Sequence, residues 1–507
     1  MLRAKRIISF DDQTSRLSRS KLVVVFLGLS FTIFLSLADQ VTVATAAPVI
    51  GKALEAGESI AWVGTSYLIA NTSSQLIYGR FSDIFGRKLC LLVAITLLVI
   101  GNLICGFSNT PAMLYVFRSI AGIGGGGMTN LSMVIVSDVV SLEERGKWQG
   151  ILSAGAAAGS AAGPFIGAAL SEQVSWRWTF WIMCPCGVVC AAVIFFCLPL
   201  TPVTGSARQK LKKLDYYGAI LSLAANVFIL IPISSGGTTF AWSSPTVIVL
   251  LIIGVFTAAA FIIVEWKVAP LPVMPLRLWT YRTTAITLGT TFFIGMIYFS
   301  NLFFLPIYFQ VLLGMSPIKS ASFLLSLLVV QVCSSLLAGI ITPYTKKVLP
   351  QVRVGFFIWT IGAGLQTTFN RQTKHANLVG LLILQGFGVG CTLQTTLVAA
   401  QAGAPNKDRA CVTGTRNCLR FMGGAFGLAI CNAILNNVIK ARLPSSIPDD
   451  VKRVITRQIS PELPSSLGPE VVEAIYSAYE DALHYIFIFF VPVVGVAFVS
   501  SCYLSLR

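Results

Sequence analysis

The chain has 507 residues, of which 55% are hydrophobic and only 11% are charged, and its formal net charge is +17. A soluble domain usually carries about 25% charged residues, and the apolar runs recur from end to end, so we predict an all-α polytopic membrane protein. Most of the 12 cysteines lie inside these runs and there are only two histidines, so we expect neither a metal site, nor a cofactor, nor a disulfide framework.

A helix needs about 20 apolar residues to cross a bilayer, and runs of this length predict fourteen spans. A polar, basic tail over 1–21 precedes them without the layout of a signal peptide, so the first run should remain as a transmembrane helix. The spans cover about 22–50, 59–78, 89–107, 112–136, 148–170, 178–199, 216–234, 245–266, 284–311, 318–341, 352–369, 376–401, 412–438 and 484–505.

The distribution of Lys and Arg predicts that both termini are cytosolic. With that orientation, 25 of the 37 Lys and Arg residues fall on the cytosolic side and 10 on the other, while Arg118 and Arg420 fall inside spans. This bias explains the basic charge by topology, so we expect no nucleic-acid partner. The longest non-cytosolic segment, 439–483, ends in a stretch predicted to form a short amphipathic helix before the last span.

Asp39 is the unusual residue of the first span, because it interrupts the apolar stretch FTIFLSLADQVTVATAAPVI (31–50). A charge at the bilayer centre costs at least a few kcal/mol, so an ionisable residue there is a candidate for function. Ser36, Asp39 and Thr42 are spaced by three and share a helix face, which should point into the bundle. We predict that Asp39 binds the proton, the positive charge of a substrate, or both in turn.

The segment GRFSDIFGRK (79–88) is predicted to form a tight cytosolic turn after the second span. It resembles the loop 2–3 signature of the major facilitator superfamily, G-x-x-x-D-R/x-x-G-R-K, and the alternative is a generic basic hairpin. The resemblance implies a loop whose charges control conformational switching. The matching residues are Gly79, Asp83, Gly86, Arg87 and Lys88.

Arg118 lies in the fourth predicted span and resembles the span-four arginine of proton-coupled facilitators. At about 1.5 Å per residue, Asp39 is roughly 26 Å from the start of its span and Arg118 roughly 9 Å from the outer start of its own. The two therefore lie at similar depth in a core about 30 Å thick. Separating them would change the proton affinity of the carboxylate; the alternatives are a permanent ion pair and an arginine that snorkels outward.

Glycines repeat in the fourth and fifth spans. In the fourth, Gly122, Gly124 and Gly127 spell the dinucleotide fingerprint G-x-G-x-x-G but lack the preceding strand that it needs, so we interpret them as packing residues.

In the fifth span, Gly163, Pro164 and Gly167 resemble the G-P-x-x-G core of facilitator antiporters, with Ala168 at the place of a second usual glycine. Gly155 and Gly159 extend the glycine face, which a simple packing face would also explain.

The resemblance extends over most of the chain. Segments 37–48, 135–150 and 414–430 are similar to the fungal fourteen-helix drug:H⁺ antiporter branch, most of all to vacuolar basic amino acid transporters. It implies a major facilitator fold of two pseudo-symmetric six-helix bundles, with two extra helices between them. The expected parts are a cytosolic tail (1–21), an N-terminal bundle (22–200), a two-helix linker (201–282) and a C-terminal bundle (283–507) that contains the 439–483 loop.

Four polar residues inside spans are candidate liners of a central cavity, because an amide or hydroxyl in a membrane helix must find a partner or water. The alternative for each is a hydrogen bond between helices. The candidates are Thr42, Asn301, Gln310 and Gln394.

We therefore predict a non-enzymatic, proton-coupled antiporter that moves basic amino acids from the cytosol into the vacuole, as a monomer with several spans in the vacuolar membrane. No phosphate-binding G-x-x-x-x-G-K-[ST] motif supports ATP drive. Its expected partners are a small-molecule substrate, protons and the lipid bilayer. The alternatives are efflux of drugs or other organic cations by proton antiport at the plasma membrane, and a sensor of the same fold that does not transport.

Overall fold

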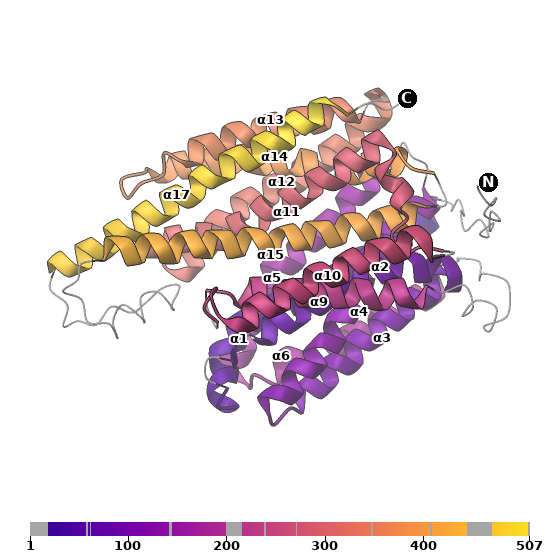
Figure 1. The fold of residues 1–507 in the computed structure, drawn as a ribbon, viewed down its shortest axis with the longest axis horizontal. Coiled ribbons are helices and arrows are strands. Elements are labelled where there is room, and N and C mark those ends of the chain that lie inside the picture. The colour runs from indigo at the N-terminus through magenta and orange to yellow at the C-terminus, as the bar shows by residue number, and fades with distance from the viewer. Residues whose placement is uncertain are drawn as a thin grey trace.

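The computed structural model describes residues 19–56, 59–60, 62–140, 144–198, 215–237, 240–269, 271–345, 348–405, 408–443 and 469–504. Helices make up nearly all of this part of the chain, and its one isolated β-bridge joins Gly236 to Phe240. The predicted all-α polytopic fold is confirmed (Figure 1).

The described helices form two groups of six spans and a pair between them. The first group is α1 (Arg19–Ala53), α2 (Trp62–Phe85), α3 (Arg87–Gly106), α4 (Pro111–Val139), α5 (Arg145–Gln173) and a last span made of α6 (Trp178–Trp181) and α7 (Met183–Cys197). The pair is α9 (Tyr216–Ser235) and α10 (Pro245–Lys267), which the short η2 (Leu276–Trp279) follows. The second group is α11 (Arg282–Ile307) with the π-helical η3 (Tyr308–Leu312), α12 (Pro317–Thr345), α13 (Leu349–Gln366), α14 (His375–Ala402), α15 (Arg409–Arg442) and α17 (Pro469–Cys502).

Each of the fourteen predicted spans corresponds to one of these spans. Twelve of them are long and apolar enough to cross a membrane by themselves. The other two are α2, which carries the polar run 71–75 on its buried side, and α13, which has only 18 residues. Polar side chains lower the hydropathy of α2, and burial against other helices removes them from lipid.

The two groups of six repeat one packing scheme. In the first, α1 packs on α5, α2 on α4, α3 on α4, and α7 on α1 and α3; in the second, α11 packs on α15, α12 on α14, α13 on α14, and α17 on α11 and α13. Of the intervening pair, α9 lies against α2 of the first half and α15 of the second. The described helices therefore form two equivalent halves that α9 and α10 flank.

The predicted loop 439–483 was too long. Helix α15 continues to Arg442, and α17 runs without a break from Pro469 to Cys502, so the amphipathic stretch is the start of α17 rather than a separate helix. The ion pair between Arg442 and Asp481, at 3.1 Å, joins these two extensions and favours their helical conformation. Our predictions for 1–18, 199–214 and 444–468 fall outside the described residues.

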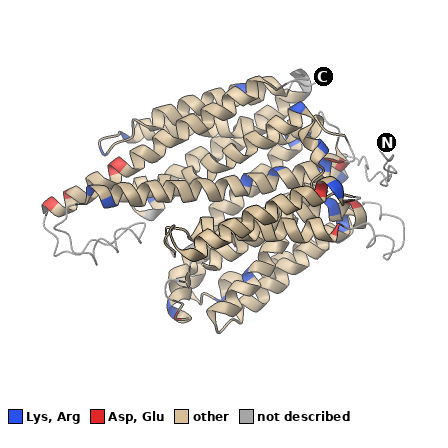
Figure 2. Cartoon of the chain, in the orientation of Figure 1, with Lys and Arg blue, Asp and Glu red and all other residues tan. Residues whose placement is uncertain are grey.

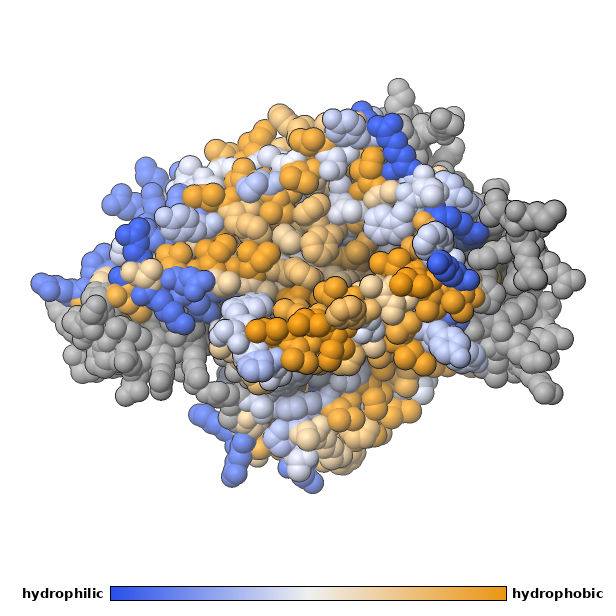
Figure 3. Space-filling view, viewed as in Figure 1, coloured by the Kyte–Doolittle hydropathy of each residue, from blue (hydrophilic) through white to orange (hydrophobic). Residues whose placement is uncertain are grey.

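The surface of the described chain suits a membrane. Charged residues gather at the two ends of the bundle (Figure 2), and apolar side chains cover much of the visible face between them (Figure 3). Helix α10 illustrates this, since most of its residues are apolar and it exposes Phe256, Ile263 and Trp266. These side chains would meet water in a soluble protein, whereas here they match the hydrocarbon of a bilayer.

Candidate functional site

Asp39 and Arg118 form an ion pair in the interior of the first half. Nη1 of Arg118, in α4, donates to both carboxylate oxygens of Asp39, in α1, at 3.1 Å. Both residues are fully buried. The similar depth that we predicted for them is therefore confirmed, and a snorkelling Arg118 is ruled out.

A polar residue and an aromatic residue, neither of which we predicted as part of the site, contact the ion pair. Nη1 of Arg118 also donates to Oδ1 of Asn102, in α3, at 3.3 Å, and the Tyr67 ring lies 4.4 Å from its guanidinium carbon. In the described residues, Nε of Arg118 and Nδ2 of Asn102 have no hydrogen-bond partner. An asparagine inside the apolar run 89–107 was a signal for Asn102, whereas nothing in the sequence distinguishes Tyr67.

The glycines of α4 make room for this cluster. A Cβ at Gly122 would collide with the carbonyl of Tyr67, and one at Gly125 with the Tyr67 hydroxyl and with Ser36. The Tyr67 hydroxyl donates to the Ser36 carbonyl at 3.1 Å, so α1, α2 and α4 meet closely here. The packing interpretation of these glycines is confirmed.

The loop signature forms a buried charge network at one end of the bundle. Asp83 accepts from Arg87 at 2.6 Å and from Arg80 at 3.4 Å, and Nε of Arg87 donates to Asp138 at 2.9 Å. This network joins α2, α3 and α4, and Arg80 extends it to the chain after α10 by donating to the Pro272 carbonyl at 2.9 Å. The sequence indicated neither Arg80 nor Asp138 as members.

The turn itself is shorter than predicted. Helix α2 continues to Phe85 and α3 begins at Arg87, so Gly86 alone reverses the chain, with a φ of 97°. That conformation strains any residue with a side chain. Lys88 lies 5.2 Å from the centre of the Phe195 ring, outside the network.

The two halves touch near this same end. A Cβ on Gly79, in α2, would lie 2.8 Å from the Ala410 carbonyl oxygen of α15, and one on Gly146, in α5, 3.0 Å from Cα of Gly339 in α12. Nearby, an ion pair between Arg277 and Asp408 connects η2 to the start of α15, with a shortest N–O distance of 2.7 Å. The described halves therefore contact each other closely at this end of the bundle.

The glycine face of α5 lies flat on α1. A Cβ on Gly155 would approach the Ser30 carbonyl oxygen to 2.6 Å, and one on Gly163 the Ala38 oxygen to 3.1 Å. Gly159 and Gly167 face the carbonyls of Phe34 and Thr42 even more closely. The face ends on the helix that carries Asp39, and Pro164 lies inside α5 on this stretch.

Hydrogen bonds join side chains of the two described halves. Gln394, in α14, donates to Oγ of Ser153, in α5, at 2.5 Å, and Asn417, in α15, donates to Oδ1 of Asn130, in α4, at 3.4 Å. Gln394 therefore lies between the halves, as a cavity liner would.

The other three predicted liners make hydrogen bonds within one half of the described chain. Thr42 donates to Ala38 of its own helix at 2.6 Å, Gln310 lies in η3 and donates to Ser320 at 3.5 Å, and Asn301 is hydrogen-bonded inside the second half. Among the described residues, none of these hydrogen bonds joins two of the four candidates.

Arg416 is the most important residue that the sequence did not indicate. It lies in the predicted span 412–438 but was not among the candidate site residues, and it is fully buried in α15. Nη2 donates to the Leu393 carbonyl and to Oγ1 of Thr396, Nη1 donates to Oδ1 of the neighbouring Asn417, and Nε has no partner in the described residues. Arg420 follows one turn later, its Nε equally without a partner. Among the described residues, no carboxylate pairs with Arg416 or Arg420.

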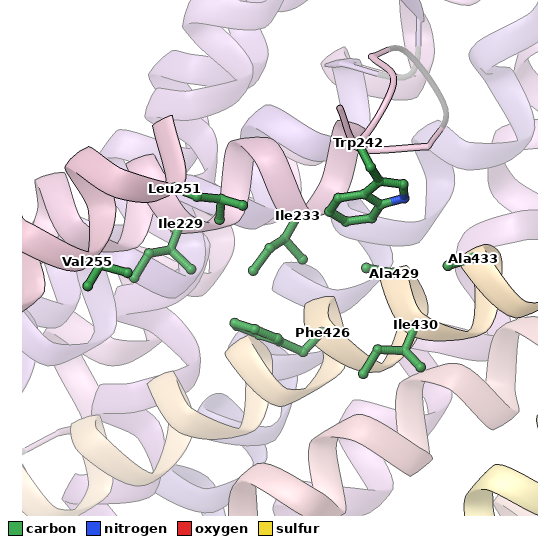
Figure 4. Close-up of a pocket in the computed structure, with 9 residues that line it drawn as sticks. All are labelled: Ile229, Ile233, Trp242, Leu251, Val255, Phe426, Ala429, Ile430 and Ala433. Atoms are coloured by element: carbon green, nitrogen blue, oxygen red, sulfur yellow. The ribbon is translucent and has the colours of Figure 1, made fainter. Parts of the chain in front are cut away.

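An apolar pocket of about 400 Å³ lies away from these charges, between α9, α10 and α15 (Figure 4). No charged side chain lines it. It is lined by Ile229, Ile233, Trp242, Leu251, Val255, Phe426, Ala429, Ile430 and Ala433.

Solved structures share this fold. The chain is similar to the proton:xylose symporter XylE, with a TM-score of 0.61, 13% identity, 96% of this chain and 97% of the other covered. It is also similar to the human organic anion transporter MFSD10, with a TM-score of 0.59, 15% identity, and coverages of 95% and 99%. At these identities the likeness concerns the fold alone.

Similar sequences include several fungal transporters. "Citrate exporter 1" of Yarrowia lipolytica is 41% identical over 99% of this chain and 75% of its own length. "MFS-type transporter clz4" of Cochliobolus lunatus is 35% identical over 96% and 86%, and "Efflux pump dotC" of Dothistroma septosporum is 34% identical over 83% and 73%. Residues 29–428 match the family described as Major Facilitator Superfamily. With this match, the repeated six-helix halves and the loop network around Asp83, the chain belongs to the Major Facilitator Superfamily.

Proposed function

We propose that this chain is a proton-coupled exporter of an organic anion that carries two or three carboxylates. One observation supports this substrate class above others: α15 holds Arg416 and Arg420 inside the membrane region, and no carboxylate pairs with either in the described chain. The buried carboxylate of Asp39 is already neutralised by Arg118. The interior therefore carries an excess of positive charge.

Such an excess is costly without a counter-ion. A guanidinium in the hydrocarbon region costs at least a few kcal/mol, and two like charges four residues apart on one helix repel each other. A bound carboxylate would offset both the cost of burying the guanidinium and the repulsion between the two arginines. The planar guanidinium binds a carboxylate with two parallel hydrogen bonds. A ligand with several carboxylates would contact both arginines at once.

Arg416 is well placed to meet a substrate that passes between the halves. Its neighbour Asn417 donates across the interface to Asn130, and Arg416 itself donates to Oδ1 of Asn417. The relative named "Citrate exporter 1", 41% identical over nearly the whole chain, supports both the anionic class and the outward direction. Those named efflux pumps support the direction.

The proton site in this proposal is the Asp39–Arg118 pair. Protonation of Asp39 would remove its charge and release the Arg118 guanidinium, so the two states differ by one charge inside a packed interior. A helix arrangement stable in one state is then unstable in the other, which is how proton binding would drive the change of access. The antiport direction, with protons entering as the anion leaves, belongs to the same proposal.

Basic amino acid transport at the vacuolar membrane remains the second candidate. The observation that favours it is the carboxylate of Asp39, which would pair with a cationic substrate once Arg118 had moved away. The charge of the described interior favours the anion, because a cation would also meet Arg416 and Arg420. For the anion exporter we propose the plasma membrane, with both termini in the cytosol.

Transport by the purified protein in proteoliposomes tests the substrate class. We expect radiolabelled citrate to accumulate under a pH gradient and lysine not to do so. Arg416→Gln and Arg420→Gln should each lower citrate transport by at least about tenfold, the equivalent of 1.4 kcal/mol. The matched control is Arg442→Gln, which removes an exposed arginine that pairs with Asp481 and should keep transport within about twofold of the unmodified protein.

Two results would count against the anion. Lysine transport with no citrate transport would restore the basic amino acid as the substrate. Citrate transport that does not change in Arg416→Gln and Arg420→Gln would remove the two arginines from the substrate path.

A further inference from the structure

A closed ring of three amide side chains lies inside the second half. Asn301, in α11, donates to Oε1 of Gln385, in α14, at 2.6 Å and accepts from Nε2 of Gln366, in α13, at 2.9 Å. Gln385 completes the ring by donating to Oε1 of Gln366 at 2.6 Å. None of the three is more than 5% exposed. We call them the amide triad.

The amide triad occupies the place that Asp39, Asn102 and Arg118 occupy in the first half. These three, the charged triad, come from α1, α3 and α4, and the amide triad comes from α11, α13 and α14, which are the first, third and fourth spans of the second half. The packing of the supporting helices is also repeated, since α4 packs on α1 and α3 as α14 does on α11 and α13.

The positions along the helices agree as well. Asp39 lies 20 residues after the start of α1 at Arg19, and Asn301 lies 19 residues after the start of α11 at Arg282. Asn102 lies 15 residues after the start of α3 at Arg87, and Gln366 lies 17 residues after the start of α13 at Leu349. Arg118 lies 7 residues after the start of α4 at Pro111, and Gln385 lies 10 residues after the start of α14 at His375. At about 1.5 Å per residue these shifts amount to less than one helical turn, so the two triads lie at similar depths in their halves.

The two triads differ in charge and in how completely they are bonded. The charged triad contains one acid and one base, and leaves Nε of Arg118 and Nδ2 of Asn102 without partners in the described chain. The amide triad contains no titratable group, and each of its six amide oxygen and nitrogen atoms takes part in a hydrogen bond within the ring. One triad can therefore change its bonding when a proton binds, whereas the other cannot.

We propose that the amide triad is a non-titratable positioning element, which keeps α11, α13 and α14 together through the transport cycle and confines proton binding to the first half. The ring consists of three short hydrogen bonds in a low-dielectric interior, and opening it would leave buried amides unsatisfied. The second half then moves as one body, and each cycle moves a single proton. The single-proton part rests on the proposed function, whereas the positioning part rests on the geometry alone.

The first test introduces an acid at the place equivalent to Asp39. In Asn301→Asp, no hydrogen bond of the ring joins an arginine to the new carboxylate. Arg420 of α15, whose backbone packs on Gly295 of α11, is not a member of the ring, so the ring would favour the protonated form. We expect transport to fall as the pH rises, by about tenfold per unit beyond the titration of this group, over a range in which the unmodified protein changes little. Adding Gln385→Arg should restore transport at high pH to within about threefold and raise the protons moved per substrate from one to two.

The second test separates positioning from substrate contact. Asn301→Ala should lower the turnover number by at least about tenfold while KM stays within about twofold, because the ring is lost and the substrate contacts remain. Gln372→Ala, which removes an exposed amide side chain from the turn between α13 and α14, should leave both parameters unchanged. Should Asn301→Asp fail to fold, Gln366→Glu places the acid in the same ring.

Several outcomes would overturn the proposal. One is a KM at least about tenfold higher in Asn301→Ala with an unchanged turnover number, since that would assign Asn301 to the substrate. Another is a pH profile of Asn301→Asp that matches the unmodified protein. A third is an unmodified protein that already moves two protons. If Asp39→Asn keeps full coupling, the proposed proton site fails, while the turnover and KM of Asn301→Ala still decide the positioning role.

Discussion

Nη1 of Arg118 donates to both carboxylate oxygens of Asp39 at 3.1 Å, and neither residue is exposed. A buried pair of this kind contributes little net stability, because desolvation offsets most of the attraction. Removing one partner, however, leaves an uncompensated charge in the interior. The pair is therefore suited to a group that gains and loses a proton as its surroundings change.

The first prediction concerns this pair. Asp39→Asn should abolish proton-driven substrate accumulation, because an amide cannot carry the proton, while exchange of substrate without a pH gradient survives. The measurement is radiolabelled substrate in proteoliposomes with and without an imposed gradient. Asp481→Asn, on the exposed start of α17, is the control and should accumulate substrate normally. Normal accumulation by Asp39→Asn would contradict the coupling role.

The second prediction concerns the buried charge network around Asp83. Asp83→Asn removes the carboxylate that holds Arg80 and Arg87, and Arg87→Ala removes the link from Asp83 to Asp138. Both should slow the change between facing states by at least about tenfold, while the substrate Kd stays within about twofold.

Stopped-flow transport measures the rate of change between facing states, and equilibrium binding measures the substrate Kd. Glu473→Gln, which alters an exposed ion pair with Arg371, serves as the control. A large loss of affinity with normal turnover would place these residues at the substrate instead.

The third prediction concerns the contact between α5 and α1. Gly159→Val would insert a branched side chain where even a Cβ collides with the Phe34 carbonyl. Overpacking of this kind costs about 1–3 kcal/mol, and we expect a lower melting temperature together with loss of transport. Gly380→Val, in α14, is the matched control, because nothing lies within 4 Å of the Cβ it would add. Equal melting temperatures for the two variants would show that the α1–α5 contact tolerates separation.

The fourth prediction concerns Gln394, the predicted liner that lies between the halves. Gln394→Ala removes its hydrogen bond to Ser153 and should raise KM or shift the balance of facing states by about threefold to tenfold, as the loss of one net hydrogen bond implies. Ser153→Ala should produce the same change, and the double variant should add little to it. Additive effects in the double variant would mean that the two side chains act separately.

Much of this protein followed from the sequence, for reasons that lie in short-range physics. Fourteen apolar runs predicted the helices, because backbone groups in lipid must bond within their own segment. The lone Asp39 in an apolar run and Gly155, Gly159 and Gly163 at helical spacing indicated a polar site and a packing face. These features depend only on residues that are near one another along the chain.

Other features depend on which helices contact each other, and the sequence analysis missed them or predicted them wrongly. Arg416 was not a candidate site residue, because nothing in the predicted span 412–438 shows that it lacks an acidic partner. The loop 439–483 was predicted too long, because its polar residues do not continue the apolar pattern of α15 and α17, which extend into it. The roles of Asn102 and Tyr67 follow from the approach of α2 and α3 to the Asp39–Arg118 pair. No pattern of neighbouring residues in the sequence predicts these contacts between helices.

The sequence by itself determined the class of protein, the number of spans and the presence of one deep carboxylate, because hydropathy and helical periodicity are properties of single segments. The tertiary structure decided that this carboxylate is neutralised by Arg118, that Arg416 and Arg420 have no acidic partner in the described chain, and that Asn301 closes an amide ring with Gln366 and Gln385. Charge balance and hydrogen-bond satisfaction are properties of side chains far apart in the sequence, and only the packing of the helices brings them within bonding distance.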